Sequence, residues 1–235
     1  MPVTFAVLLC YYVCMKNDQS KANELLEKLE FLFEKYSNEP RAMTQPYLLQ
    51  RVIDSVPGYE YHPDDVVVRE SLMEHVGSLP VVATAFYPYI NDDQVDLGKA
   101  LTMIAIHDIG ELKTHDEMTF TKQASAKNPE REAALSLLDP YYHDLYEDVE
   151  SQTSITAKFA KAIDKITPDI FEYFSPAEIT LRRYKHFVGL ETVDEVIDLI
   201  SRKKQPYMAW SPFMTEFHKL LLDRLEAKLS SPSPR

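Results

Sequence analysis

Apolar residues recur at helical spacing along most of this chain, and prolines or capping residues separate the segments. In the segment 18–37, leucines and phenylalanines stand three or four positions apart among lysines and glutamates, and Pro40 follows shortly after. A second such segment spans 45–55 and leads into a loop at Pro57-Gly58. No run of strict alternation between apolar and polar residues is long enough to predict a strand. The pattern therefore predicts an all-α fold.

Capping residues predict where several helices begin and end. Ser71-Leu72-Met73-Glu74 has the pattern of a capping box and places His75 in the second turn of its helix. Gly189 is well placed to end the helix that begins at residue 176. Three helices are predicted to start at a capping residue followed by a proline, which is tolerated at the first helical position: Asn128-Pro129, Ser175-Pro176 and Ser211-Pro212.

The composition fits one sizeable helical domain and narrows the choice of substrate. A length of 235 residues and an apolar share of 45% suffice for an ordinary buried core. Five glycines against 15 prolines argue against a glycine-rich phosphate loop and a turn-rich β-sandwich. The net charge of −12 gives no general attraction for a nucleic acid polymer, which binds through lysine and arginine. An anionic substrate would need a local positive charge, which a bound cation provides.

The two cysteines, Cys10 and Cys14, both lie in the apolar run 3–15. Cysteines four residues apart form neither a disulfide framework nor a four-ligand zinc site, so we expect a reducing, cytoplasmic setting. The run is too short to span a bilayer, and it lacks the basic start and the cleavage site of a secretion signal. We expect a buried or partly ordered terminal element with no membrane partner; an amphipathic or targeting role is the alternative.

Three of the seven histidines are followed by aspartate: His107-Asp108, His115-Asp116 and His143-Asp144. Only the first pair ends an apolar segment, 101–106, which is apolar nearly all round and is expected to be a core helix. Two ionisable residues at such a position are costly unless they are paired or coordinated. The alternative is a helix end that emerges into solvent. The other two dipeptides lie among polar or tyrosine-rich residues and are expected at the surface.

Two further residues are candidates for the same site. Asp164 lies in the small-residue, apolar segment 159–166, where a carboxylate needs a cation. His75 lies beside Leu72, Val76 and Leu79, and by itself it fits a core histidine with a satisfied ring better than it fits a ligand.

In their order and spacing, these residues resemble the metal-dependent phosphohydrolases with an HD domain. The resemblance covers roughly residues 69–170. The run His107-Asp108-Ile109-Gly110-Glu111, with Asp116 eight residues beyond Asp108, is similar to the bacterial 5′-deoxynucleotidase branch. The segments 128–138, 145–150 and 162–166 are similar to the same branch.

The resemblance implies a role for each position. It implies one divalent metal ion (Mn, Co, Zn, Fe, Ni or Mg) and four ligands, namely His75, His107, Asp108 and Asp164. Glu111 matches the residue that orients or deprotonates the attacking water or protonates the leaving oxygen, and Asp116 matches an acid near the leaving group or sugar. A solvent-exposed Asp116 is the alternative, since its neighbours are polar.

Phosphate binding also needs cationic side chains. The family places an arginine shortly before the first histidine, and Arg69 matches it; Lys113 and Lys165 are further candidates. The deoxynucleotidase branch has another arginine about fifteen residues before that histidine, where this chain has the segment 59–62 without an arginine. Arg51 is the nearest upstream substitute.

The resemblance divides the chain into a helical extension at 1–60, an HD-domain core at 61–175 and C-terminal helices at 176–235 packed on the same domain. The tail is expected to be disordered from about residue 230. The expected activity is release of phosphate from a small nucleotide. A nucleoside triphosphate, a cyclic nucleotide or another phosphorylated metabolite stays open as substrate, and so does a homodimer. A dinuclear oxygenase or phosphodiesterase would need His115 and His143, and a non-catalytic signalling module would usually have lost ligands.

Overall fold

The computed structural model describes residues 23, 25–44, 46–65, 68–90, 92–116 and 127–231. These residues are mostly helical, which confirms the predicted fold class. A first helix spans 25–38, and the further elements are β1 (Pro40–Thr44), α2 (Pro46–Ser55), β2 (Arg69–Ser71), α3 (Leu72–Phe86), α4 (Leu97–Ile106), α5 (Glu111–Thr114), α6 (Lys127–Leu137), α7 (His143–Ser151), α8 (Ile155–Phe174), α9 (Ala177–Val188), α10 (Val193–Met208) and α11 (Pro212–Ser230). Short 3₁₀ turns lie at Tyr87–Tyr89 and Pro140–Tyr142.

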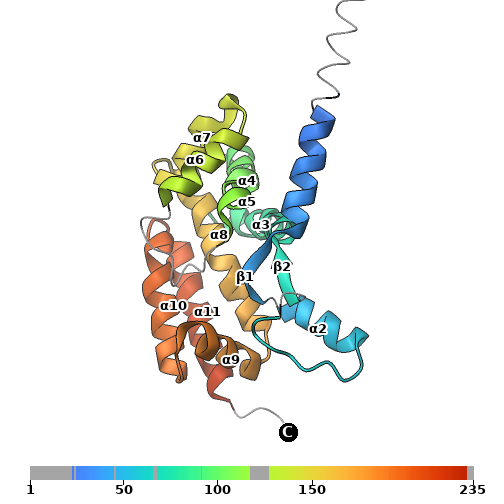
Figure 1. Ribbon diagram of the computed structural model, residues 1–235. Coiled ribbons are helices and arrows are strands. Elements are labelled where there is room, and N and C mark those ends of the chain that lie inside the picture. The colour runs from blue at the N-terminus through green and yellow to red at the C-terminus, as the bar shows by residue number, and fades with distance from the viewer. Residues whose placement is uncertain are drawn as a thin grey trace, which may run out of the picture.

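Helix α8 runs through the middle of the molecule (Figure 1) and packs against α3, α4, α7, α10 and α11. Its buried face carries Phe159, Ala160, Ile163 and Ile166, which lie in the largest apolar core cluster. Small alanines on this face let neighbouring helices approach closely, and the apolar face explains why the segment is buried although it also carries charged residues. Asp164 therefore lies on a helix that is held from several sides.

A two-stranded antiparallel sheet was not predicted. In this sheet, which we call the β1–β2 ribbon, Pro40 pairs with Ser71 and Thr44 with Arg69, with an irregular register in between. The strands have five and three residues, too few for alternation to be visible in the sequence. The ribbon brings the segment after the first helix beside the start of α3.

Most of the predicted helix ends are confirmed. Ser71 and Glu74 form the capping box of α3, Ser211 caps α11, and Gly189 ends α9 with a positive φ of 77°. Helix α9 begins at Ala177 because Ser175 already ends α8 and Pro176 acts as the N-cap. Helix α6 begins at Lys127, so Pro129 lies inside the first turn, where its missing N–H is still tolerated.

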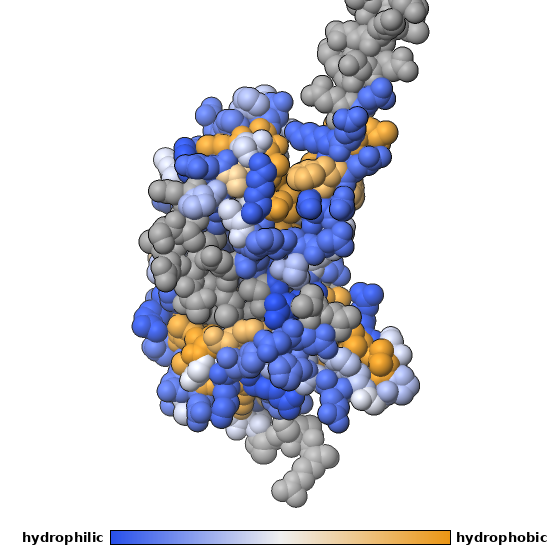
Figure 2. Space-filling view, in the orientation of Figure 1, coloured by the Kyte–Doolittle hydropathy of each residue, from blue (hydrophilic) through white to orange (hydrophobic). Residues whose placement is uncertain are grey.

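The first helix contacts the rest of the protein mainly through its C-terminal half. Tyr36 is buried and Leu32 packs beside it, whereas several other large apolar side chains are exposed: Leu25, Leu26, Leu29, Phe31 and Phe33. An apolar area is visible where this helix meets the body (Figure 2). The predicted start at 18, the apolar run 3–15 with both cysteines, and the tail beyond Ser231 lie outside the described residues. Within the described part, none of the helices has the length and apolarity needed to cross a membrane.

Candidate metal centre

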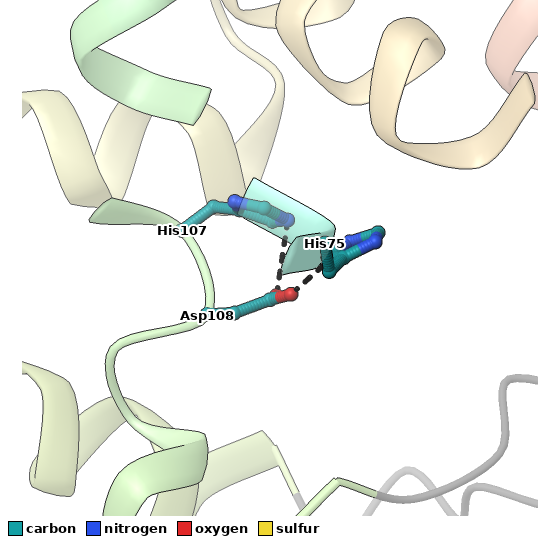
Figure 3. A group of neighbouring side chains, drawn as sticks. All are labelled: His75, His107 and Asp108. Carbon is teal, nitrogen blue, oxygen red and sulfur yellow. Dashed lines mark ion pairs between the residues drawn. The ribbon is translucent and has the colours of Figure 1, made fainter. Parts of the chain in front are cut away.

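Four candidate ligands converge from three parts of the fold. His75 is the fourth residue of α3, His107 and Asp108 follow the end of α4, and Asp164 lies in the middle of α8. All four residues are buried. Figure 3 shows Asp108 between the two imidazole rings, with an ion pair to each. Residues 89 positions apart in the sequence thus form one cluster.

The distances from the two imidazole rings to the two carboxylates are those of atoms that share one ion. Nε2 of His75 lies 3.5 Å from Oδ2 of Asp108 and 3.4 Å from Oδ1 of Asp164. Nε2 of His107 lies 3.1 Å from Oδ1 of Asp108 and 3.4 Å from the same Asp164 oxygen. Ligand atoms about 2.1 Å from a metal are about 3.0 to 3.4 Å apart in octahedral or tetrahedral geometry. Among the described residues, His75, His107 and Asp108 form the one group of three or more such side chains whose ligand atoms all lie close enough to one another to hold a metal ion, and Asp164 is not in this group.

The orientation of His107 shows why this cluster fits a cation. Its Nδ1 lies 2.7 Å from the carbonyl oxygen of Ile104, which can only accept a hydrogen bond, so Nδ1 carries the proton. In the neutral ring, Nε2 then points a lone pair at the carboxylates. Nε2 of His107 and Nε2 of His75 are both buried without a hydrogen-bond partner among the described residues. Lone pairs and anionic oxygens that face one another need a positive charge between them.

Charge in the cluster is strongly coupled. Burial by itself lowers the pKa of His107, but the carboxylates of Asp108 and Asp164 outweigh it and raise this pKa to about 10. Burial would raise the pKa of Asp164, yet Lys165 and His107 hold it well below its usual range. Burial likewise opposes ionisation of Asp108, but His107 and Arg41 keep its pKa low. Both carboxylates are therefore ionised, and a divalent cation would compete with a proton for His107.

A tight turn after Asp108 connects the cluster to α5. The N–H of Glu111 donates to the carbonyl of Asp108, and Gly110 lies against α6. A methyl group on Gly110 would collide with the backbone carbonyl of Glu130, which is part of a helix and cannot rotate away. Gly110 thus allows α6 to approach the turn that carries Asp108 and Glu111.

We expect Gly110→Ala to lower the free energy of unfolding by about 1 to 3 kcal/mol, the usual cost of overpacking. Chemical denaturation measures this difference. Gly77→Ala is the matched control, because a methyl group on Gly77 would meet nothing within 4 Å and this glycine is inside helix α3. Alanine there should stabilise the protein by about 0.5 to 1 kcal/mol. Equal stability of the two variants would show that the close approach of α6 has no energetic weight.

Arg41, on strand β1, is the residue of this site that the sequence did not reveal. Its Nη1 lies 3.1 Å from Asp108, 3.0 Å from Glu111 and 3.2 Å from Asp116. These three carboxylates outweigh the effect of burial and raise the already high pKa of Arg41, so it is always charged. An arginine-rich or carboxylate-rich motif around residue 41 would have drawn attention to it, but the segment 40–44 contains no such signal. The pairing of β1 with β2 places Arg41 among these three carboxylates.

We expect Arg41→Met to lower the free energy of unfolding of the metal-free protein by about 3 to 5 kcal/mol at neutral pH, because the buried, ionised carboxylate of Asp108 would lose its counter-charge and Glu111 and Asp116 would lose their ion-pair partner. Urea denaturation measures the loss, and it should shrink at low pH, where the carboxylates are protonated. Arg51→Met, on the exposed side of α2, should change stability by less than about 0.5 kcal/mol. A loss no larger than this for Arg41→Met would contradict the charge arrangement.

The other predicted site residues divide into two groups. Glu111 and Asp116 lie beside the cluster with nearly buried side chains, and Nζ of Lys165 lies 2.9 Å from Oδ2 of Asp164. The remaining two have partners elsewhere. Lys113 is exposed and donates to Oγ of Ser136, and the Arg69 guanidinium lies over the ring of Phe187 on α9.

The histidines required for a second metal are occupied elsewhere. His115 is exposed and its Nδ1 lies 2.9 Å from Oε1 of Glu39. Nε2 of His143 lies 3.1 Å from the carbonyl oxygen of Leu135. The described residues therefore give the dinuclear alternative no support.

Comparisons with known proteins show the family of this chain and proteins of similar fold. The sequence profile of the HD domain matches residues 60–178. A similar structure is that of a predicted metal-dependent phosphohydrolase from Magnetospirillum magnetotacticum MS-1, at 21% identity and a TM-score of 0.59, covering 88% of this chain and 98% of that one. Another is a conserved hypothetical protein from Pyrococcus furiosus, at 19% identity and a TM-score of 0.49, covering 82% and 98%. No curated protein matches the chain.

Proposed function

Because this chain belongs to the HD-domain family, we propose that its buried cluster holds one divalent metal ion and hydrolyses a phosphate ester. The observation that carries the proposal is a pair of buried imidazole Nε2 atoms that face two ionised carboxylates and have no hydrogen-bond partner among the described residues. Two neutral imidazoles and two carboxylates balance the charge of a divalent ion and leave positions open for small ligands.

When bound, such an ion would lower the pKa of a water molecule beside it and would polarise the phosphoryl group. The remaining chemistry belongs to side chains of this protein. Burial and the charge of Asp108 raise the pKa of Glu111 well above its usual range, although Arg41 opposes them. A carboxyl group that keeps its proton near neutral pH can donate it to a leaving oxygen, and in its ionised form it accepts one from water. Glu111 is therefore the catalytic acid or base in this proposal.

Phosphate binding falls to Arg41 and Lys165. Both cations lie at the cluster, with side chains 17% and 19% exposed, and both contact a carboxylate that we assign to the metal. Guanidinium and ammonium groups are the usual partners of phosphate oxygens. Arg69 and Lys113, which the sequence suggested, contact Phe187 and Ser136 respectively and stay further candidates. Asp116, held by Arg41, stays a candidate for contact with the leaving group.

The proposed substrate is a small nucleoside 5′-monophosphate. Support comes from the similarity of the segment 107–111 and Asp116 to the 5′-deoxynucleotidase branch, and from the acidic net charge of −12, which disfavours a nucleic acid polymer. A phosphate monoester has a dianionic end that suits one metal ion and two cations. In this substrate the nucleoside is the alcohol to which the phosphate is esterified.

Phosphate release from a matched panel tests this proposal. Purified protein with added Mn²⁺ or Co²⁺ is assayed with nucleoside mono-, di- and triphosphates, a cyclic nucleotide and a simple sugar phosphate. We expect inorganic phosphate from monophosphates above all. Release of pyrophosphate or triphosphate, or cleavage of the cyclic nucleotide alone, would show that the site hydrolyses another class of phosphate ester and not a monophosphate. Absence of all hydrolysis in metal-loaded protein would refute the enzymatic proposal.

A further inference from the structure

A buried glutamate lies directly behind the His75 ring. Oε1 of Glu70, on strand β2, lies 3.5 Å from Nδ1 of His75, the ring nitrogen that faces away from the two metal-facing carboxylates. Both side chains are 1% exposed. A carboxylate buried to this extent needs a hydrogen-bond donor or a positive charge beside it. The charge of Glu70 therefore acts inside the protein, where the His75 ring is one of the groups beside it.

His107 provides a comparison within the same cluster. Its Nδ1 is held by the backbone carbonyl of Ile104 at 2.7 Å, so that its Nε2 is left to face Asp108 and Asp164. In α3, the corresponding position behind His75 is filled by a side chain from the β1–β2 ribbon. An acceptor behind a ligating histidine fixes the ring and its tautomer and makes the metal-facing nitrogen more basic.

We propose that Glu70 is a positioning residue that accepts a hydrogen bond from Nδ1–H of His75 and so directs Nε2 of His75 to the metal ion. The inference rests on the proposed metal site, although it does not depend on which ester is hydrolysed. Capture of an ion at Nε2 would make Nδ1–H a stronger donor and so strengthen its interaction with Oε1 of Glu70, which lies 3.5 Å away.

The β1–β2 ribbon carries two charged residues that contact the proposed metal ligands. Strand β1 carries Arg41, whose pKa is raised in part by the charge of Glu70, and strand β2 carries Glu70 itself. One small sheet thus supplies both the cation that contacts Asp108 and the anion behind His75. The HD-domain match covers residues 60–178. Arg41 lies before this match, and through it the preceding segment contacts the proposed metal ligand Asp108.

Metal affinity tests the proposal. Co²⁺ and Mn²⁺ are titrated into metal-free wild-type protein, Glu70→Gln and Glu70→Leu, with Glu216→Gln on the exposed side of α11 as the matched control. Loss of an outer partner of a ligand usually costs about 10- to 100-fold in affinity, and we expect about 10-fold for the amide and nearer 100-fold for leucine. The control should bind as the wild type does. Should Glu70→Leu fail to fold, the nearly isosteric Glu70→Gln carries the test.

A spectroscopic signature separates positioning from a merely structural role. In the Co²⁺-loaded protein, proton NMR should show shifted, exchangeable ring N–H signals from both ligating histidines. Replacement of Glu70 should move the signal of His75 and speed its exchange with water, while the signal of His107, held by Ile104, stays in place as an internal control. Unchanged affinity in the folded variants, or an unchanged His75 signal, would overturn the proposal. Wild-type protein that binds Co²⁺ but hydrolyses no ester would refute the proposed activity and leave this inference intact.

Discussion

Asp108→Asn is expected to remove most bound metal and to lower phosphate release on the order of 10³-fold, comparable to the loss of a principal electrostatic group in an active site. The carboxylate of Asp108 faces both imidazoles and also contacts Arg41, so the amide replaces a ligand and a counter-charge at once. Metal analysis of the purified variant and a phosphate assay measure the two losses separately.

The matched control for this variant is Asp223→Asn, an exposed carboxylate on α11 away from the cluster. It should keep the metal content and the activity of the wild type. Circular dichroism on both variants shows whether the helices remain. If folded Asp108→Asn keeps its metal and releases phosphate at the wild-type rate, Asp108 is not a ligand and the assignment of the site is wrong.

Glu111→Gln is expected to keep the metal ion while kcat falls by about 10²- to 10⁴-fold, the usual contribution of a general acid or base. Glu111 contacts Arg41 and is not one of the four proposed ligands, so metal content should not follow activity. The two measurements together identify its role. Loss of metal in proportion to activity would show that Glu111 acts on the ion and not on the proton.

Although Glu111→Gln is expected to lower kcat, we expect it to raise the stability of the folded protein. Burial and Asp108 raise the pKa of Glu111, so the folded protein keeps this proton after the unfolded chain has lost it. Such a group lowers stability as the pH rises above the usual carboxyl pKa of about 4.3. Metal-free Glu111→Gln should therefore melt at a higher temperature than the wild type at neutral pH, and the difference should vanish near pH 4. A lower melting temperature at neutral pH would contradict a raised pKa.

The local sequence is sufficient to predict a buried charged residue where that residue interrupts an apolar pattern. His107-Asp108 ends an apolar segment, and Asp164 lies on the small-residue face of a core helix, so burial of these charges can be predicted from the residues around them. His75 gives no such signal, because one histidine beside leucines fits an ordinary core better than it fits a metal site. Only the family resemblance indicated His75 as a ligand, and the packing of α3 against α4 and α8 brings it into the cluster.

The contribution of the β1–β2 ribbon could not be predicted for a physical reason. Arg41 and Glu70 reach the cluster because two very short strands pair across a long connection, and this pairing depends on backbone hydrogen bonds that leave no periodic pattern in the side chains. The choice of Arg69 as a phosphate ligand followed the family resemblance, which places an arginine shortly before the first histidine, and it stays a prediction. In the structure its guanidinium lies over Phe187, whereas Arg41, much farther away in sequence, contacts Asp108.

Reconstitution with a counted amount of metal tests the central claim most directly. Wild-type protein is stripped with a chelator, which is then removed, and Mn²⁺ or Co²⁺ is added in small steps while phosphate release from a nucleoside monophosphate is measured. The account predicts no release without metal and a linear rise that ends at one equivalent per chain. Full release from the stripped protein, or a rise that continues to two equivalents, would contradict a single metal ion held by His75, His107, Asp108 and Asp164.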